Sequence, residues 1–416
     1  MAILKPFRGI RPVKEKAAFV ASRPYDVLNK AEARIEAAGN PWSFLHVIKP
    51  EMDLPDTIHE YDPAVYNQGI NTFKRMQAEG LFLQDEQECL YVYAQTMNGR
   101  TQYGLVGCAA VEDYLNDIIK KHELTRPDKE EDRKNHIRVS SYHYEPVFFA
   151  YHPVKEIDEI IASVTSAPAE YDFTSADGFG HHFWVIRDKI LIRKLTGLFG
   201  SKVRYTYVAD GHHRTAAAAL VGKERKEANK SHTGKEEYNY FLAVHFPANQ
   251  LAIIDYNRLV KDLNGQTKEQ FLSKLSDYFE LKEKGTEIYS PAALHNFSMY
   301  IDGKWYSLSA KNHTYDDNDP IRCLDVTVLS DFVLDKILGI TDLRKSKRID
   351  FVGGIRGLGE LKKRVDSGEM VVAFALYPVT MKQLMDIADT GNIMPPKTTW
   401  FEPKLRSGLV IHSLEG

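Results

Sequence analysis

The stretch YVADGHHRTAAAAL (Tyr207–Leu220) concentrates an aspartate, two histidines and an arginine between a strand-like run and a run of four alanines. The pattern predicts a strand, a turn at Asp210 and Gly211, and a short helix over Arg214–Val221 that stops at Gly222. Backbone N–H groups at a helix N-terminus face outward, and the helix dipole adds positive potential there. Glycine in the turn permits a positive φ angle or the close approach of a ligand. The geometry therefore favours an anion such as phosphate.

The side chains of this turn could serve three kinds of site. His212, His213 and Arg214 are cationic or hydrogen-bonding groups, and an arginine can bind two phosphate oxygens at once. Thr215 adds a hydroxyl. The residues alone leave open a phosphate site, a metal site, and a plain helix start in which Asp210 is the N-cap and the histidines are surface groups.

The metal interpretation needs ligands from elsewhere in the chain. Asp210 with His212 or His213 could join the pair His181-His182. Adjacent histidines on a strand or turn point apart, so each pair offers one ligand at a time. Since there is no cysteine nearby and no HxxxH helix, the spacing is a weak metal signal.

A possible base lies upstream, in the motif HELT (His122–Thr125). A helix is expected over Val111–His122, which places Glu123 just beyond its end and before the charged run Arg126–Lys134. A carboxylate there could act as general base toward a hydroxyl nucleophile. The alternative is a solvated glutamate at a helix end.

Other candidates for ligand contact lie further along the chain. Trp184, within the strand-like HHFWVI, is either a platform for a substrate or a core residue. Lys397, Lys404 and Arg406 lie in the proline-containing tail, where they could form an arm that reaches a phosphate or could simply be surface charges.

Composition limits the class of protein. The 416 residues predict two or three domains, and the net charge of -3 gives no reason to expect nucleic acid or an anionic membrane as partner. No apolar run approaches the ~20 residues that span a bilayer, and the N-terminus lacks the apolar core of a signal peptide. Cys89, Cys108 and Cys323 are expected to be free buried thiols in a reducing cytoplasm. The oligomeric state stays open, with a homodimer as one candidate.

Local patterns predict a mixed α+β chain with three regions: 1–110, an N-terminal α+β region; 111–265, a core with the DGHHR turn; and 266–416, a C-terminal β-α-β-α region. Asn98-Gly99 predicts a type I′ hairpin turn. Thr267 and Gln270 form a capping box, and Asp325 is expected to cap a helix that runs through Leu338.

Several spaced blocks resemble those of one family, the bacterial and archaeal domain-of-unknown-function family numbered 1015. The blocks, in chain order, are RPYDVL, NPWSFLHV, HELTRPDKEEDR, YDFTSADGFGHHFWVI, VADGHHRTAAA and MPPKTTWFEPKLRSGL. The central DGHHR resembles the phosphate-binding turn of the ParB and sulfiredoxin superfamily. Within that superfamily it is most similar to the free serine kinases, which phosphorylate L-serine with a nucleotide.

This resemblance implies a central ParB/sulfiredoxin-like phosphate-binding core and a nucleotide-dependent phosphotransferase that acts on a small hydroxyl-bearing metabolite. The amides of Gly211–Thr215 would hold the phosphate of ATP or ADP, Asp210 would hold Mg²⁺ or orient a histidine, and Glu123 would take the proton from the acceptor hydroxyl. Two alternatives are a non-enzymatic nucleotide-binding regulatory protein and a metal-dependent hydrolase.

The site residues expected are, by role: catalytic, Glu123, Asp210 and His212; phosphate- or nucleotide-binding, Gly211, His213, Arg214 and Thr215; substrate-binding, Trp184, Lys397 and Lys404; metal-binding, Asp210.

Overall fold

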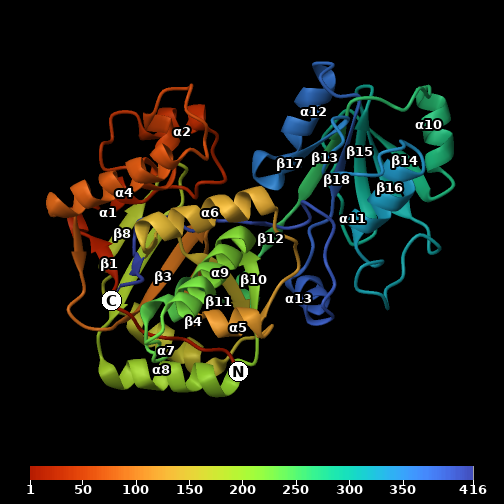
Figure 1. The fold of residues 1–416 in the computed structure, drawn as a ribbon. Helices are drawn as coiled ribbons and strands as arrows, with labels where there is room; N and C mark the ends of the chain where they lie inside the picture. The colour runs from red at the N-terminus through yellow and green to blue at the C-terminus, as the bar shows by residue number, and fades with distance from the viewer. Residues whose placement is uncertain (416) are drawn as a thin grey trace. The chain divides into compact units, whose positions relative to one another are not determined.

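A computed structural model describes residues 1–415 and has the mixed α+β architecture that the sequence predicts (Figure 1). The chain divides into two compact units. The first comprises Met1–Leu251 together with Pro403–Gly416, and the second comprises Ala252–Glu402. The end of the chain thus returns to the first unit, which also contains the DGHHR turn.

The first unit is built on an eight-stranded mixed sheet. Its neighbours are antiparallel except for two parallel pairs, β5 with β10 and β7 with β11. In spatial order the strands are β5 (Ile119–Lys120), β10 (Thr206–Asp210), β7 (Val147–Tyr151), β11 (Tyr240–Pro247), β4 (Arg100–Ala110), β3 (Leu90–Met97), β9 (Gly180–Ile186) and β8 (Tyr171–Thr174).

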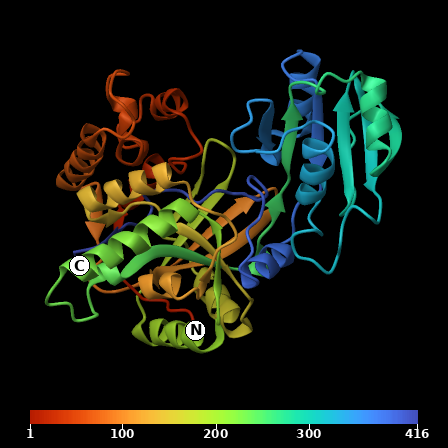
Figure 2. The same ribbon diagram turned by 45° about the vertical axis from the view of Figure 1, so that its right-hand side comes forward.

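Helices cover this sheet, and α6 and α9 lie side by side (Figures 1 and 2). The small residues Ala217–Ala219 of α9 are buried in one core cluster with Val147 and Phe149 of the sheet, so the alanine run brings the helix close to the strands. The helices of the first unit are α1 (Ala17–Val20), α2 (Lys30–Ala37), α3 (Leu45–Ile48), α4 (Pro63–Ala78), α5 (Val111–Leu115), α6 (Pro127–Ser140), α7 (Lys155–Thr165), α8 (Lys189–Lys202) and α9 (His212–Ala228).

The predicted helix over Val111–His122 is wrong beyond its first turns. Helix α5 ends at Leu115, and Asp117 takes a left-handed conformation with φ of 58°. The chain then forms β5, in which Ile119 is buried against the core beneath α9. The apolar residues with helical spacing are therefore divided between a short helix and a strand. Pairing with β10 provides the hydrogen bonds that the backbone of Ile119 and Lys120 would otherwise make in a helix.

Helix α9 is longer than predicted at both ends. It starts at His212 and passes through Gly222 to Ala228. Gly222 does not stop the helix, because it serves packing: a Cβ there would lie 2.5 Å from the carbonyl oxygen of Tyr238 and 2.7 Å from Val111. Only a residue without a side chain lets these segments approach so closely.

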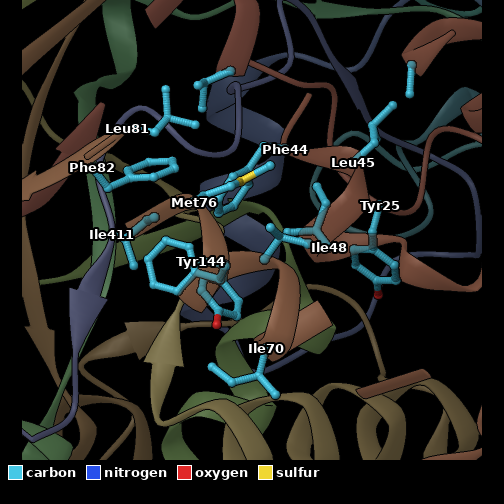
Figure 3. Close-up of a cluster of buried hydrophobic side chains, with 14 of the residues drawn as sticks. Tyr25, Phe44, Leu45, Ile48, Ile70, Met76, Leu81, Phe82, Tyr144 and Ile411 are labelled. Atoms are coloured by element: carbon cyan, nitrogen blue, oxygen red, sulfur yellow. The ribbon is translucent and has the colours of Figure 1, made fainter. Parts of the chain in front are cut away.

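A second core anchors the N-terminal helices to the sheet region. Phe44 and Tyr144 lie in this core, which Figure 3 shows. Together with Phe73 they pack edge to face, with ring centroids 5.0 to 6.2 Å apart. The same cluster buries Tyr25, from the RPYDVL block, and Ile411, from the C-terminal segment. Residues from both ends of the chain are therefore fixed in one core.

The C-terminal segment is an integral part of the first unit. Arg406, which is buried, donates to Nε2 of His181 and pairs with Asp177. Further along, Ile411 bridges to Ile10, and β20 (His412–Ser413) pairs with β6 (Tyr142–His143). These contacts hold the tail lysine Lys404 in a defined place. A further two-stranded pair joins β1 (Ile10–Pro12) to β2 (Phe82–Gln84).

The second unit is a six-stranded antiparallel sheet with helices, as the alternating pattern predicts. In spatial order its strands are β14 (Phe279–Gly285), β16 (Lys304–Ala310), β15 (Asn296–Ile301), β18 (Val372–Leu376), β13 (Tyr256–Val260) and β17 (Ile349–Gly353). Its remaining elements are the short pair β12 (Ile253–Ile254) and β19 (Trp400–Phe401) and the helices α10 (Lys268–Leu275), α11 (Asp325–Val328), α12 (Leu358–Asp366) and α13 (Met381–Asp389).

The helix expected from Asp325 to Leu338 is not one regular α-helix. Asp325 is the first residue of α11, where its carboxylate accepts from the backbone N–H of His295. A π-helical stretch, Leu329–Asp335, follows. The side chain that looked like a cap is thus used to hold a distant loop.

Several local predictions are confirmed. Asn98 and Gly99 both have positive φ angles, 52° and 76°, as a type I′ turn requires. Thr267 and Gln270 make both hydrogen bonds of a capping box. The three cysteines are free and buried. Among residues 1–415, no helix combines the length and the apolar character needed to cross a bilayer.

One buried histidine makes the first unit sensitive to acid. The ring of His245, in β11, lies against Phe149 and Phe199, and neither ring nitrogen has a hydrogen-bond partner among residues 1–415. Burial lowers the pKa of His245 from 6.5 to about 3. As the pH falls below 6.5, the unfolded chain takes up a proton that the folded chain does not, so the free energy of unfolding falls until about pH 3.

We therefore expect His245→Phe to flatten the pH dependence of stability by up to about 1.4 kcal/mol per pH unit between pH 6 and pH 4. Urea unfolding measured across this range gives the slope of the free energy of unfolding against pH. A packing change caused by the substitution shifts the free energy equally at every pH and leaves this slope unchanged. The exposed His152, replaced by glutamine, is the control. An unchanged slope in His245→Phe would contradict the assignment.

Candidate functional site

The strand, glycine turn and helix start predicted at DGHHR are present in the backbone. Strand β10 ends at Asp210, Gly211 has a φ of 91°, and α9 begins at once with no side chain capping its N-terminus. A Cβ at Gly211 would lie 3.2 Å from Nε and Cζ of Arg214. The turn therefore needs glycine both for its left-handed conformation and for the arginine folded over it.

The parallel pairing of β5 with β10 brings HELT to this turn. Ile119 pairs with Thr206 and Lys120 pairs with Tyr207. Because the two strands run in the same direction, the residues that follow them emerge at the same edge of the sheet. Glu123 is thereby placed beside the start of α9, with its Oε2 3.9 Å from Nδ1 of His212.

His122, which was not among the expected site residues, joins this group. Its ring lies edge-on to that of His212, with centroids 4.5 Å apart. Burial lowers the pKa of His122 to about 4, and burial together with the neighbouring His122 holds the pKa of His212 well below its usual value. Both imidazoles are neutral near pH 7. The sequence did not indicate His122 as a site residue, because His122 was expected to be the last residue of a helix.

Asp210 is held between two cations. Its Oδ2 accepts from Nη2 of Arg214 at 2.8 Å, and its Oδ1 accepts from Nζ of Lys404 at 2.7 Å. Burial by itself would raise the pKa of Asp210, but Lys404 and Arg214 outweigh it and lower the pKa. The ionised carboxylate therefore ties the turn to the C-terminal segment.

Arg214 is also engaged by the protein. Besides Asp210, its guanidinium donates from Nη1 to the carbonyl oxygen of Pro146 at 2.8 Å, and the residue is buried. Burial by itself would lower the pKa of Arg214. Nearby carboxylates, with Asp26 and Asp210 the strongest, raise it instead. Arg214 is thus a fixed positive charge behind the turn.

His213 and Thr215 stabilise the turn through hydrogen bonds to backbone groups. Nε2 of His213 accepts from the backbone N–H of Arg126 at 3.0 Å, and burial lowers the pKa of His213, so the neutral ring is available as an acceptor. This bond fastens the loop that carries Glu123. The hydroxyl of Thr215 donates to the carbonyl oxygen of Gly211 at 2.9 Å.

The remaining expected residues are placed differently. Lys404 is in the site, where its backbone carbonyl also accepts from Nε2 of Gln95. Trp184 lies on β9, which is not a neighbour of β10, and its indole donates to the carbonyl oxygen of Ala167 and packs near Tyr103. Lys397 belongs to the second unit.

The histidine pair of the metal interpretation is occupied by other partners. His181 bonds through Nδ1 to the hydroxyl of Tyr93 and through Nε2 to Ser175. His182 pairs with Asp172. The donors that do gather beside the turn are His122, Glu123 and His212.

Comparisons with known proteins give a family and weak structural similarities. No curated protein matches the sequence of this chain. A conserved hypothetical protein from Pyrococcus furiosus is 15% identical, with 75% of this chain and 96% of that chain covered and a TM-score of 0.36. A free serine kinase in complex with AMP is 13% identical, with 74% and 92% covered and a TM-score of 0.36.

A third solved structure, C-terminally truncated SbnI from Staphylococcus aureus, is 11% identical, with 73% of this chain and 85% of that chain covered and a TM-score of 0.37. Similarities this weak say nothing about the activity of this chain. The sequence profile described as "Protein of unknown function (DUF1015)" matches residues 4–327, which is most of the chain. The chain belongs to the DUF1015 family.

Proposed function

We propose that this protein is a nucleotide-dependent phosphotransferase that acts on a small hydroxyl-bearing metabolite, in the manner of a free serine kinase. The observation that supports this most directly is the position of Glu123 beside the uncapped N-terminus of α9, 3.9 Å from His212. One group able to accept a proton thus stands next to one group able to bind phosphate.

The turn supplies the phosphate-binding half. The amides of His212 and His213 lie at the positive end of α9, and Gly211 has no side chain to block them. Arg214 and Lys404 add fixed positive charge on either side of Asp210. Preorganised charge of this kind is what phosphoryl transfer requires, because it stabilises the equatorial oxygens of the transferred group.

Glu123 supplies the other half. The acceptor hydroxyl oxygen forms a bond to phosphorus as the bond from phosphorus to the bridging oxygen of the nucleotide breaks. The electron pair of that bond leaves with the nucleotide, and the hydroxyl proton passes to the carboxylate of Glu123 and then to solvent. Glu123 is about one third exposed, so acceptor and solvent can reach it.

Magnesium at Asp210, which the resemblance implies, does not fit these residues. Both oxygens of Asp210 already accept from cationic groups. The donors nearest the turn are two imidazoles and a single carboxylate, whereas Mg²⁺ prefers oxygen ligands. No step above depends on Mg²⁺, and Asp210 acts as the group that positions Arg214 and Lys404.

The role of Glu123 is tested by Glu123→Gln. We expect phosphoryl transfer from ATP or ADP to L-serine or another small alcohol to fall by about 10²–10⁴-fold, because a general base is lost. Nucleotide affinity should change by less than about twofold, since the amide groups are untouched. Product formation is followed by phosphorus NMR, and affinity by calorimetry.

Glu131→Gln, on the exposed face of α6, is the matched control. Wild-type protein that binds nucleotide but transfers phosphate to no amino acid or small alcohol would point instead to the non-enzymatic nucleotide-binding protein. Release of inorganic phosphate or other hydrolysis, without transfer, would favour the hydrolase.

The phosphate-binding turn is tested by Gly211→Ala. The added Cβ would press on Arg214. The turn would also hold the alanine in a left-handed conformation, which costs about 1–2 kcal/mol for a residue with a side chain. We expect the Kd for nucleotide to rise at least about tenfold.

Gly234→Ala separates the two effects, because Gly234 has a similar φ of 86° but nothing within 4 Å of its Cβ position. This control should lose stability and keep its affinity. Equal nucleotide affinity in Gly211→Ala and wild type would show that the phosphate binds elsewhere.

A further inference from the structure

Three metal-ligating side chains meet beside the start of α9. His122 and Glu123 follow β5, and His212 is the first residue of α9. One donor atom from each lies within 4.8 Å of the others. Among residues 1–415, no other group of three or more histidine, cysteine or carboxylate side chains lies close enough together to share an ion.

One residue of this group has a buried ring nitrogen without a partner in the described part of the chain, while its other ring nitrogen, Nδ1, lies 3.9 Å from Glu123. His212 is only 8% exposed, and its Nε2 makes no hydrogen bond among residues 1–415. A buried polar nitrogen left without a partner is costly, because its hydrogen bond to water is lost and nothing replaces it. Each such atom in a folded protein calls for an explanation, and a bound ion is one of the recognised ones.

The donor set selects the kind of ion. Two imidazole nitrogens and one carboxylate oxygen suit Mn²⁺, Fe²⁺ or Zn²⁺ better than Mg²⁺ or Ca²⁺, which prefer oxygen. Bonds of about 2.1 Å in tetrahedral geometry place donors about 3.4 Å apart. The three donor atoms lie within 4.8 Å of one another, so the group closes by up to about 1.4 Å around the ion. Glu123, which is partly exposed, can supply that movement.

We infer that His122, Glu123 and His212 bind one divalent transition-metal ion at the N-terminus of α9. Three protein ligands would leave at least one coordination position open, at a site beside the helix N-terminus, where an anion is favoured. Oxygens of water would complete the coordination there. One oxygen of Glu123 would bind the ion, and the other would stay free to take up the proton of the acceptor hydroxyl in the proposed transfer. The site stands whether or not the chain transfers phosphate.

Metal binding is tested on the full chain without a histidine tag and without nucleotide. After dialysis against a chelator, Co²⁺ is titrated in while its visible absorption is recorded, and bound Mn²⁺ and Zn²⁺ are measured by elemental analysis. We expect one ion per chain. Glu123→Gln should weaken binding at least about tenfold, because the loss of even a supporting group costs this much.

Two matched controls are Glu131→Gln and His152→Gln, which alter an exposed glutamate and an exposed histidine and should leave binding unchanged. Binding in Glu123→Gln equal to wild type, or no stoichiometric ion in the wild type, would overturn the inference. His212→Gln should abolish binding.

A spectroscopic measurement on the wild type covers the case in which His212→Gln does not fold. Pulsed electron paramagnetic resonance of bound Cu²⁺ should show coupling to two imidazole nitrogens, and its absence would overturn the site. Because the metal titration contains no nucleotide, its result does not depend on phosphoryl transfer. A failed metal site and a failed phosphotransferase can therefore be told apart.

Discussion

The site depends on a parallel pairing of only two residues in each strand. Ile119 and Lys120 of β5 lie beside Thr206 and Tyr207 of β10. Without this contact HELT and DGHHR would be unrelated segments with 84 residues between them. A pairing this short contributes little by itself. It is secured because Ile119 is buried with α9 above it, and because His213 holds the backbone of Arg126. Packing and one side-chain hydrogen bond therefore fix where Glu123 lies.

A second constraint is electrostatic. Arg214 is buried, and a buried charge without a partner is expensive. Asp210 compensates it, and Lys404, from the far end of the chain, pairs with the other oxygen of Asp210 and leaves the cluster with one net positive charge. This arrangement explains why the C-terminal segment is built into the first unit, with Arg406 buried beside His181. The cluster and the tail stabilise each other, so the turn is completed only when the last residues are in place.

Much of the local structure could be predicted because its cause is local. The hairpin at Asn98 and Gly99 follows from positive φ angles, and the capping box at Thr267 follows from hydrogen bonds within four residues. The turn at Gly211 belongs to the same class. In each case the residues that cause the feature are neighbours in the sequence.

The errors have distant causes. Gly222 was predicted to end the helix. Its lack of a side chain instead leaves room for Tyr238 and Val111, which pack against that position. The run that ends at His122 has helical spacing, yet it becomes a strand because β10 offers a partner. For the same reason His122 could not be recognised as a site residue, since its neighbour His212 is 90 positions away. Spacing within one segment carries no information about such contacts.

Most of the polar residues in DGHHR serve the site by building it. Asp210 bonds to Arg214 and Lys404, His213 to Arg126, and Thr215 to Gly211. A dense polar motif is therefore not a list of ligand contacts, because a charge can be held rigidly only if other polar groups surround it. Once these bonds are assigned, the backbone amides and the Nε2 of His212 stand out from the motif. The proposed phosphate and metal ligands are therefore assigned to those groups together with Glu123, and not to the polar side chains that build the turn.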